Sequence, residues 1–186
     1  MFGIRSGYEQ LSYNIIENFN DIEIRNYPKR VAIEIQDAEN DREAFFALFD
    51  YISGKNINNA NISMTSPVEV SKENLKITMT SPVEKNNINN KVQMRFFLPK
   101  EFTIENSPKP INPKVKVIEI PEQTFAVLNY SGFNGNEKFN AKAEELKLIL
   151  SKSLYKIVGE PTYFGYDPPF TIPFLRKHEV LIPVEK

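Results

Sequence analysis

The chain has 186 residues, of which 41% are hydrophobic, 12% aromatic and 25% charged, and its formal net charge at pH 7 is −1. A chain of this length buries about 70% of its unfolded surface on folding, so it can form a core without disulfides or structural metals. Its composition excludes a disordered or fibrous protein. The near-neutral charge lacks the basic footprint of a nucleic-acid-binding domain, so we expect no nucleic-acid partner.

The absence of cysteine excludes disulfides, thiolate metal sites and cysteine nucleophiles. No stretch approaches the ~20 apolar residues that a membrane-spanning helix needs. The N-terminal residues lack the basic region and apolar core of a signal peptide. We therefore expect a cytoplasmic protein, and the alternative is an exported protein whose leader is not part of this sequence.

The first predicted elements are two short β-rich runs, at 22–25 and 30–36, which are separated by a proline break. A helix is predicted next, because Asn40 or Asp41 can cap its first turn and apolar residues follow at helical spacing. These apolar residues are Phe45, Leu48, Phe49 and Ile52. Gly54 is the residue type that commonly follows the last turn, so we expect the helix to end there.

Three further strands are predicted, at 62–70, 75–83 and 92–98. The first two contain the same six residues, MTSPVE, which begin at Met64 and at Met79. A turn between the copies would pair them as an antiparallel hairpin in which each methionine faces a serine of the other copy, and Ile62 faces Val83. The opposite, wetter face would carry Thr65, Thr78, Thr80, Glu69 and Glu84. The alternative is a functional one, in which Met64 and Met79 line a ligand cavity.

A Pro-rich stretch at 108–113 is predicted to separate two halves that share the same order of elements. After it come two strand-like runs, a long helix at about 136–158 and two final strands, at 163–166 and 179–184. One stripe of this second helix carries Phe139, Ala143, Leu146, Leu150 and Leu154.

The predicted fold class is α+β, with an antiparallel sheet and two helices on one side. We expect a single domain over 1–186, built from pseudo-repeats at about 8–107 and 114–185. A pseudo-two-fold duplication of this kind follows from the repeated order of strands and helix in the two halves.

Catalytic and metal-binding motifs are sparse. The one histidine, His178, precedes the last predicted strand, where a half-exposed polar position is expected and a metal ligand or base is the alternative. With no cysteine and one histidine, a zinc-type site is not expected. The sequence also lacks a Gly-x-Ser-x-Gly elbow, a P-loop and a dinucleotide-binding glycine motif. We expect no enzyme, although a lone buried Glu or Tyr can act as a catalytic group.

Aromatic residues occur beside basic residues in two segments. The first helix contributes Arg42, Phe45, Phe46 and Phe49, and the late loop contributes Tyr163, Phe164, Tyr166, Phe170, Phe174, Arg176 and Lys177. Each ring can simply belong to the core. Together they can form the site that a flat apolar anion needs, with rings against its faces and a cation beside its carboxylate.

Six stretches, taken in order, resemble the signature segments of the SOUL/heme-binding protein family: FNDIEIRNYPKRVAIEI, FDYISGKN, MTSPVE, MRFFLPKEF, PKPINPKVKVIEIPEQTFAVLNYSGF and YFGYDPPFTIPFLRKHEVLIPVE. The resemblance covers almost the whole chain, from about residue 8 to 185. The doubled MTSPVE segment is similar to bacterial members. The combination of segments is specific, whereas any one of them alone would be weak.

The resemblance implies a distorted antiparallel β-barrel of two pseudo-symmetric halves, related to the GyrI-like effector-binding domains of multidrug-responsive regulators. It implies that heme or another tetrapyrrole binds in a shallow apolar groove between the first helix and the loop before the last strand. By position it assigns Arg42 to a propionate and Phe45 and Phe49 to the ring. The facing side of the groove would carry Tyr166, Phe170 and Phe174. The axial histidine of one branch of the family corresponds to Asn26, so that ligand is absent.

We therefore expect a non-enzymatic, heme-binding protein, with Phe46, Arg176, Met64 and Met79 as further candidate ligand contacts and His178 as a weak candidate metal ligand. One alternative is a binding module for other amphipathic small molecules or for a protein partner. Another is a GyrI-like hydrolase, which requires a carboxylate inside the groove.

Overall fold

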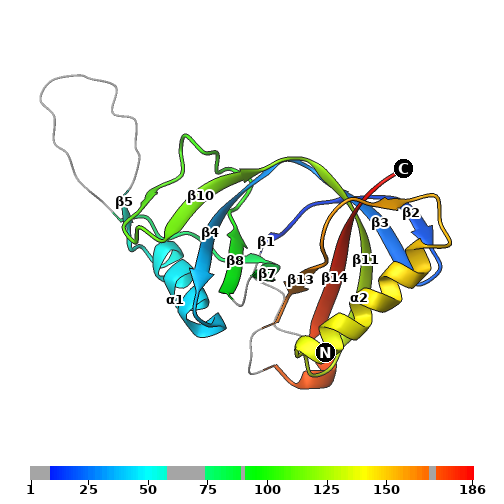
Figure 1. Cartoon of the computed structure of the whole chain (residues 1–186). Helices are drawn as coiled ribbons and strands as arrows, with labels where there is room; N and C mark the ends of the chain where they lie inside the picture. Colours follow the sequence, from blue (N-terminus) through cyan, green and yellow to red (C-terminus); the bar gives the residue numbers. More distant parts are fainter. Residues whose placement is uncertain (1–8, 58–73, 89–90, 168–170) are drawn as a thin grey trace, which may run out of the picture.

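The computed structural model describes residues 9–57, 74–88, 91–167 and 171–186. These residues form two α-helices, one large antiparallel sheet and two short two-stranded sheets (Figure 1). The helices are α1 (Asp41–Ile52), α2 (Asn136–Leu150) and the short 3-10 helix η1 (Pro173–Leu175). The strands are β1 (Glu9–Gln10), β2 (Asn14–Phe19), β3 (Ile22–Tyr27), β4 (Arg30–Ala38), β5 (Asn56–Ile57), β6 (Thr80–Ser81), β7 (Val83–Ile88), β8 (Lys91–Phe97), β9 (Lys109–Pro110), β10 (Val115–Ile120), β11 (Gln123–Ser131), β12 (Lys156–Ile157), β13 (Thr162–Gly165) and β14 (Lys177–Glu185).

The large sheet has the strand order β10-β4-β8-β7-β13-β14-β11-β3-β2, with β12 paired beside β14. From β10 to β3 this order is symmetric about the boundary between β7 and β13. On one side lie β10, β4, β8 and β7, and on the other side their counterparts β3, β11, β14 and β13. The helix α1 follows β4 in the chain, and α2 follows its counterpart β11. The predicted α+β class is confirmed. The sheet is not closed, because β10 and β2 at its ends are not paired with each other. The barrel expected from the sequence is therefore an open, curved sheet.

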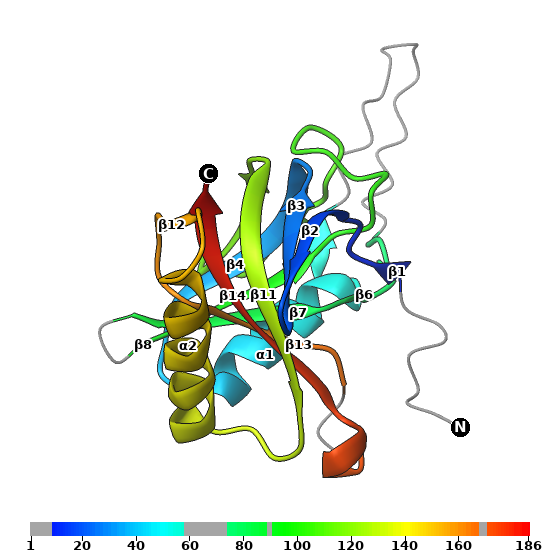
Figure 2. The same cartoon turned by 90° about the vertical axis from the view of Figure 1, so that its right-hand side faces the viewer.

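Both helices pack on the same face of the sheet, which we call the helix face. Directly paired residues of antiparallel strands share a face. One such row runs from Phe96 through Val83, Gly165 and His178 to Tyr130. At one end of this face α1 buries Leu48 and Ile52, and at the other end α2 buries Ala143, Leu146 and Leu150. Figures 1 and 2 show the helices at opposite ends of the sheet.

The other face, which we call the inner face, carries a third core. Its members come from seven strands of the large sheet: Tyr27, Ala32, Phe97, Ile120, Phe125, Val127, Phe164 and Leu181. Leu11 and Tyr13, from the segment around β1, pack against this cluster. Because both halves of the sheet contribute to it, the inner core joins them into one unit.

The first helix agrees with its prediction at both ends. The side chain of Asn40 caps α1 by accepting a 2.9 Å hydrogen bond from the backbone N–H of Glu43. Gly54, two residues beyond the last helical residue, has a φ of +108°, a conformation that L side chains rarely adopt. The predicted stripe is only partly right, since Leu48 and Ile52 are buried but Phe49 is 41% exposed.

The second helix is shorter than predicted. It ends at Leu150, after which turns lead to β12, and β12 pairs with β14. Leu154, the predicted last member of the apolar stripe, lies beyond the helix and is 78% exposed. The prediction was wrong there because the helical spacing of apolar residues continues by chance past the C-cap at Ser151.

The second MTSPVE copy, which begins at Met79, does not pair as the predicted hairpin requires. Only Thr80 and Ser81 of the predicted strand 75–83 form β6, which pairs in parallel with β1. Val83 begins β7 and is paired with Phe96 on one side and Gly165 on the other. It therefore has no free side on which to pair with Ile62, its predicted partner. Thr80 and Glu84 are buried rather than on a wetter face. The first copy, with Met64, lies outside the described residues.

Candidate functional site

A cleft of about 1010 Å³ lies between the two helices on the helix face. Asp41 borders it at the start of α1, and α2 borders it from Gly135 to Lys147. Between them the cleft is lined by Lys85 of β7 and Tyr163 of β13, which are paired residues on adjacent strands. The cleft therefore lies where the two half-sheets meet, at β7 and β13, which Figure 1 shows between the two helices.

A glycine leaves room for Tyr163, one of the residues that line the cleft. Gly165 lies in the helix-face row between Val83 and His178. A Cβ at this position would lie 2.7 Å from the hydroxyl oxygen of Tyr163 and 3.0 Å from its Cε1. Only a residue without a side chain therefore leaves room for the Tyr163 ring in this position.

Tyr163 and His178 form a hydrogen-bonded pair next to this glycine. The distance from the tyrosine Oη to Nδ1 of His178 is 2.8 Å, and Nε2 of His178 lies 3.0 Å from the carbonyl oxygen of Gly132. Because that carbonyl can only accept, Nε2 carries the proton and the neutral imidazole accepts at Nδ1 from the Tyr163 hydroxyl. The rings of Tyr130 and Tyr163 lie 5.2 and 5.7 Å from the imidazole.

Burial changes the acid–base properties of both groups. His178 is only 4% exposed, so the expectation of a half-exposed position was wrong. Burial lowers the pKa of His178, and the nearby cation Arg176 lowers it further. Burial also raises the pKa of Tyr163 to about 12. Near neutral pH the pair is therefore an uncharged phenol bonded to an uncharged imidazole.

The predicted aromatic helix surface is present on α1. The rings of Phe45 and Phe49 are stacked, with centroids 5.8 Å apart and an interplanar angle of 13°. Phe45 also packs against Phe96 and the core under α1. Phe46 is 50% exposed, and the Arg42 guanidinium lies 5.8 Å from the centre of its ring. The structure thus brings Arg42, Phe45, Phe46 and Phe49 together.

The loop before the last strand is divided between the two faces. Tyr166 donates a 2.5 Å hydrogen bond to the carboxylate of Glu179 and packs against the inner core, so it does not face α1. Phe174, on η1, is exposed, and the Nε of Arg176 donates to the carbonyl of Thr171. Phe170 lies outside the described residues. The remaining candidate, Met79, packs against the core under α1.

Electrostatics nevertheless connect α1 with this loop through Tyr163. Besides burial, the groups that act on the pKa of Tyr163 include Asp41 at the start of α1 and Asp167 and Arg176 from the loop. A coulombic influence of this kind requires the charges to lie nearby. Tyr163 therefore lies between the two segments that the sequence singled out.

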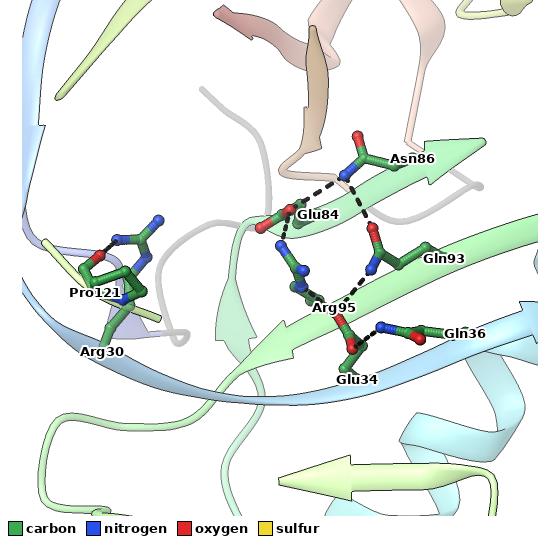
Figure 3. Close-up of polar contacts among 8 residues, drawn as sticks. All are labelled: Arg30, Glu34, Gln36, Glu84, Asn86, Gln93, Arg95 and Pro121. Atoms are coloured by element: carbon green, nitrogen blue, oxygen red, sulfur yellow. Dashed lines mark hydrogen bonds and ion pairs between the residues drawn. The ribbon is translucent and has the colours of Figure 1, made fainter. Parts of the chain in front are cut away.

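The buried carboxylates lie on the inner face, not in the cleft. Arg95 of β8 binds Glu34 of β4 and Glu84 of β7, with 2.6 Å from its Nε to Glu34 and 2.6 Å from its Nη1 to Glu84 (Figure 3). Gln93 donates to the same oxygen of Glu34 at 2.9 Å. Burial raises the pKa of Glu84, although Arg95 opposes this effect.

A second polar cluster surrounds Glu179 on the inner face. Its carboxylate is fully buried and binds the guanidinium of Arg25 at 3.0 Å and the ammonium of Lys177 at 2.8 Å. Tyr166 completes its hydrogen bonding, as described above. The carboxylates that line the cleft are Asp41, Glu144 and Glu160, and all three are exposed.

The sequence did not reveal Lys85 as a cleft residue, nor Gly165 as the residue that makes room for Tyr163. Both belong to strands whose pairing, β7 with β13, joins segments far apart in the chain. His178 was noticed as the one histidine, but its partners Tyr163 and Gly132 come from other elements. Both of its ring nitrogens are bonded within the protein, so it offers no free metal ligand. The described residues contain no group of three or more His, Asp or Glu side chains placed to hold a metal ion.

Comparisons with known proteins agree on family and fold. The family model described as SOUL heme-binding protein matches residues 8–183. No curated protein sequence matches the chain. Among solved structures, a hydrolase from Listeria innocua is 12% identical with a TM-score of 0.58, covering 91% of this chain and 94% of its own.

Two further solved structures have the same fold. The C-terminal domain of EcmrR is 13% identical with a TM-score of 0.57, covering 94% of this chain and 98% of that domain. An uncharacterized conserved protein from Listeria innocua is 12% identical with a TM-score of 0.59, covering 90% of this chain and 93% of its own. At these identities the likeness concerns the fold alone. None of the described helices is both long enough and apolar enough to cross a membrane.

Proposed function

Because the chain belongs to the SOUL heme-binding protein family, we propose that it binds heme or a related tetrapyrrole without catalysing a reaction. The ligand would lie against the aromatic surface of α1, on the side that faces the cleft and the segment before β14. The observation that carries this proposal is the pair of exposed rings, Phe46 and Phe49, with the Arg42 guanidinium beside them.

These residues fit the organic part of a tetrapyrrole. The exposed rings leave apolar surface in water, and a flat apolar macrocycle would cover that surface. Phe45 stacks on Phe49 and is anchored on Phe96, so the surface is held in place by the core. Arg42 offers a forked cation for a propionate. The exposed Phe174 and the basic Arg176 would complete the opposite side.

The two candidate positions for an iron ligand, Asn26 and His178, do not suit that role. Asn26 occupies the position of the axial histidine, and its amide donates to Glu122 at 3.0 Å. His178 has both ring nitrogens engaged, as described above. Bound heme would supply a large apolar ring with two carboxylates, and the protein would hold it through contacts to that ring and those carboxylates. We therefore propose no role for the iron in recognition.

Titration of the purified protein with hemin, followed by Soret absorbance, tests the proposal. A saturable change is expected, and metal-free protoporphyrin IX should bind within about a factor of three, because the iron adds little. Arg42→Ala, Phe46→Ala and Phe49→Ala should each weaken binding by about tenfold, or about 1.4 kcal/mol. Leu148→Ala is a matched control, since Leu148 is an exposed apolar residue of α2 that does not line the cleft.

Two outcomes would contradict the proposal. One is the absence of any saturable response to hemin and to protoporphyrin IX. The other is equal binding by the Phe46→Ala, Phe49→Ala and Leu148→Ala proteins, because the α1 rings would then not contact the ligand. A strong preference for hemin over protoporphyrin IX would reject only the statement about the iron.

A second candidate function is the binding of other amphipathic small molecules within the cleft itself. The cleft combines apolar Phe139 and Tyr163 with the cation Lys85 and several amide side chains, so its lining differs from the α1 surface. A thermal-shift screen with lipids, drug-like aromatics and porphyrins separates the two. Stabilisation by non-porphyrins that is lost in Phe139→Ala, and retained in Phe46→Ala, would favour the cleft.

Hydrolysis has no comparable support, although one structural neighbour is named a hydrolase. A hydrolase of this fold would need a carboxylate inside its groove. Among the described residues, the carboxylates of the cleft are exposed, and the buried Glu34, Glu84 and Glu179 are paired with cations on the inner face.

A further inference from the structure

A second cavity, of about 310 Å³, lies beside the start of β4 and the end of β8, and it shares no lining residue with the cleft. It is covered by the β1 segment and bordered by the start of β4 and by the chain that follows β8. Much of its lining is apolar, from Leu11, Val31, Phe97, Leu98 and Phe102. A cavity of this size and lining is suited to a small molecule with an apolar body.

Three cations line this cavity, and Arg30 is the buried one, only 8% exposed, whereas Lys29 and Lys100 are exposed. The Nη1 of Arg30 makes two long hydrogen bonds, 3.3 Å to the carbonyl of Pro28 and 3.5 Å to that of Pro121 (Figure 3). Its Nε is buried and has no hydrogen-bond partner. The rings of Tyr27 and Phe97 hold the guanidinium, at 5.4 and 5.5 Å from their centres.

The carboxylates around Arg30 are engaged elsewhere. Among the described residues, none lies within ion-pair distance of it, and Glu119, at the edge of the cavity, binds Lys29 at 3.1 Å. Among the acids, Glu84 has the largest influence on the pKa of Arg30, but its carboxylate is bonded to Arg95. Burial lowers the pKa of Arg30. Figure 3 shows Arg30 apart from the Glu84–Arg95 pair.

A buried guanidinium with an unsatisfied donor is costly to the fold. Natural proteins leave few such donors, and each one calls for an explanation, such as a bound water, an ion or a ligand. Arginine donates to carboxylates through two parallel hydrogen bonds, a geometry that two long bonds to backbone carbonyls do not satisfy. The adjoining cavity has room for the missing acceptor.

We propose that this cavity binds a small monocarboxylate with an apolar body, whose carboxylate pairs with Arg30 and whose body contacts Leu11, Phe97 and Phe102. The site is separate from the α1 surface and does not depend on the proposed function above. Three carboxylates (Glu9, Glu105 and Glu119) and three cations (Lys29, Arg30 and Lys100) line the cavity, so it has no excess positive charge for a second negative charge on the ligand, and the ligand class is limited to monoanions.

The probe is 4-phenylbutanoate, with 4-phenylbutanamide as its neutral counterpart. In a 1H–15N spectrum of the wild-type protein the Nε–H signal of Arg30, identified by its loss in Arg30→Met, should shift in a saturable manner with the carboxylate. The amide should bind at least tenfold more weakly. Arg30→Met should weaken carboxylate binding at least tenfold by calorimetry, whereas Lys116→Met, which removes an exposed cation of β10 outside the cavity, should leave it unchanged.

The proposal is overturned if the Arg30 signal does not move up to the solubility limit of the carboxylate. It is also overturned if acid and amide bind equally, since Arg30 would then be a structural cation only. If Arg30→Met does not fold, the wild-type spectra and the more conservative variant Arg30→Lys test the proposal. Undiminished carboxylate binding by Arg30→Lys would exclude a contact through two parallel hydrogen bonds from the guanidinium. Hemin binding by the wild type is measured separately, so failure of one proposal leaves the other standing.

Discussion

The phenol of Tyr163 donates to Nδ1 of His178 at 2.8 Å, and the two residues come from adjacent strands at the end of the cleft between the helices. The bond fixes the imidazole as the neutral tautomer that also donates to Gly132. His178 is the one histidine of the chain, so its titration can be followed without overlap from other imidazoles.

The first prediction concerns pH. The pKa of His178 is lowered on folding, chiefly by burial, so the folded protein keeps the imidazole neutral at a pH where the unfolded chain already binds a proton. The stability contributed by His178 is therefore fully present above its unfolded pKa of about 6.5, and is lost as the pH falls through the lower folded value. NMR titration should give a folded pKa below about 6.5.

Urea unfolding checks the same linkage. Between about pH 7.5 and 5.5, the free energy of unfolding of the wild type should fall more than that of His178→Gln, which does not titrate in this range. Equal losses in both proteins, or a folded pKa at or above the unfolded value, would show that burial does not destabilise the imidazolium.

A second prediction concerns Gly165. In Gly165→Ala the new methyl group would meet the Tyr163 ring, so the tyrosine must move away from His178. The measured pKa of His178 should therefore change, and ligands of the cleft should bind differently. Gly135→Ala is the control, because nothing lies within 4 Å of a Cβ at Gly135 and its φ is −164°, in the extended region. An unchanged His178 titration in Gly165→Ala would contradict the proposed contact.

A third prediction concerns the Glu34–Arg95–Glu84 group. Arg95→Met leaves two buried carboxylates without their cation, so the free energy of unfolding should fall by about 3–5 kcal/mol near neutral pH. Lys91→Met removes an ion pair with Glu39 that lies largely in solvent, and should cost about 0–1 kcal/mol. Urea denaturation measures both, and similar losses would mean that the buried pairs add little.

A fourth prediction concerns Asn56, whose side chain links the end of α1 to Leu75. Its amide donates to the carbonyls of Tyr51 and Leu75, both at 2.7 Å, and its oxygen accepts from the N–H of Leu75 at 3.0 Å. Asn56→Asp has the same shape but removes both donors and buries a charge. The loss of stability should reach about 3 kcal/mol or more.

The control for this change is Asn112→Asp. The side chain of Asn112 is exposed and accepts from the N–H of Lys114 at 3.0 Å, a bond that an aspartate keeps. Its stability should change by less than about 0.5 kcal/mol. If both variants lose the same amount, the donors of Asn56 do not hold the two segments together.

Local signals predicted the local parts of the fold. Asn40 and Gly54 mark the ends of α1 because capping depends on a few neighbouring residues. The strand predicted at 92–98 was also right, since β8 covers Lys91–Phe97, and its alternate residues Val92, Met94 and Phe96 are buried in the core under α1. The family resemblance is confirmed by the family match over residues 8–183, but the barrel that it implied is an open sheet.

The predictions that failed depended on which distant strands pair with each other. The two MTSPVE copies were predicted to pair with each other because they are alike and close in the chain. In the structure, Val83 of the second copy is instead paired with Phe96 of β8 and Gly165 of β13. Glu84 appeared to be a solvent-exposed residue, and only the pairing of β7 with β8 places Arg95 next to it. Tyr166 was expected beside α1, although its hydroxyl is held by Glu179 on the inner face. Which face a residue occupies depends on the register, and the sequence does not state the register.

The symmetric order of the sheet has a mechanical consequence. The two half-sheets are joined at β7 and β13 by three residue pairs, Lys85–Tyr163, Glu84–Phe164 and Val83–Gly165. Each half carries its own helix, so a small change of twist along this short seam would alter the spacing between α1 and α2. The same seam lines the cleft with Lys85 and Tyr163. A molecule bound there would therefore contact the strands that join the two helix-bearing halves.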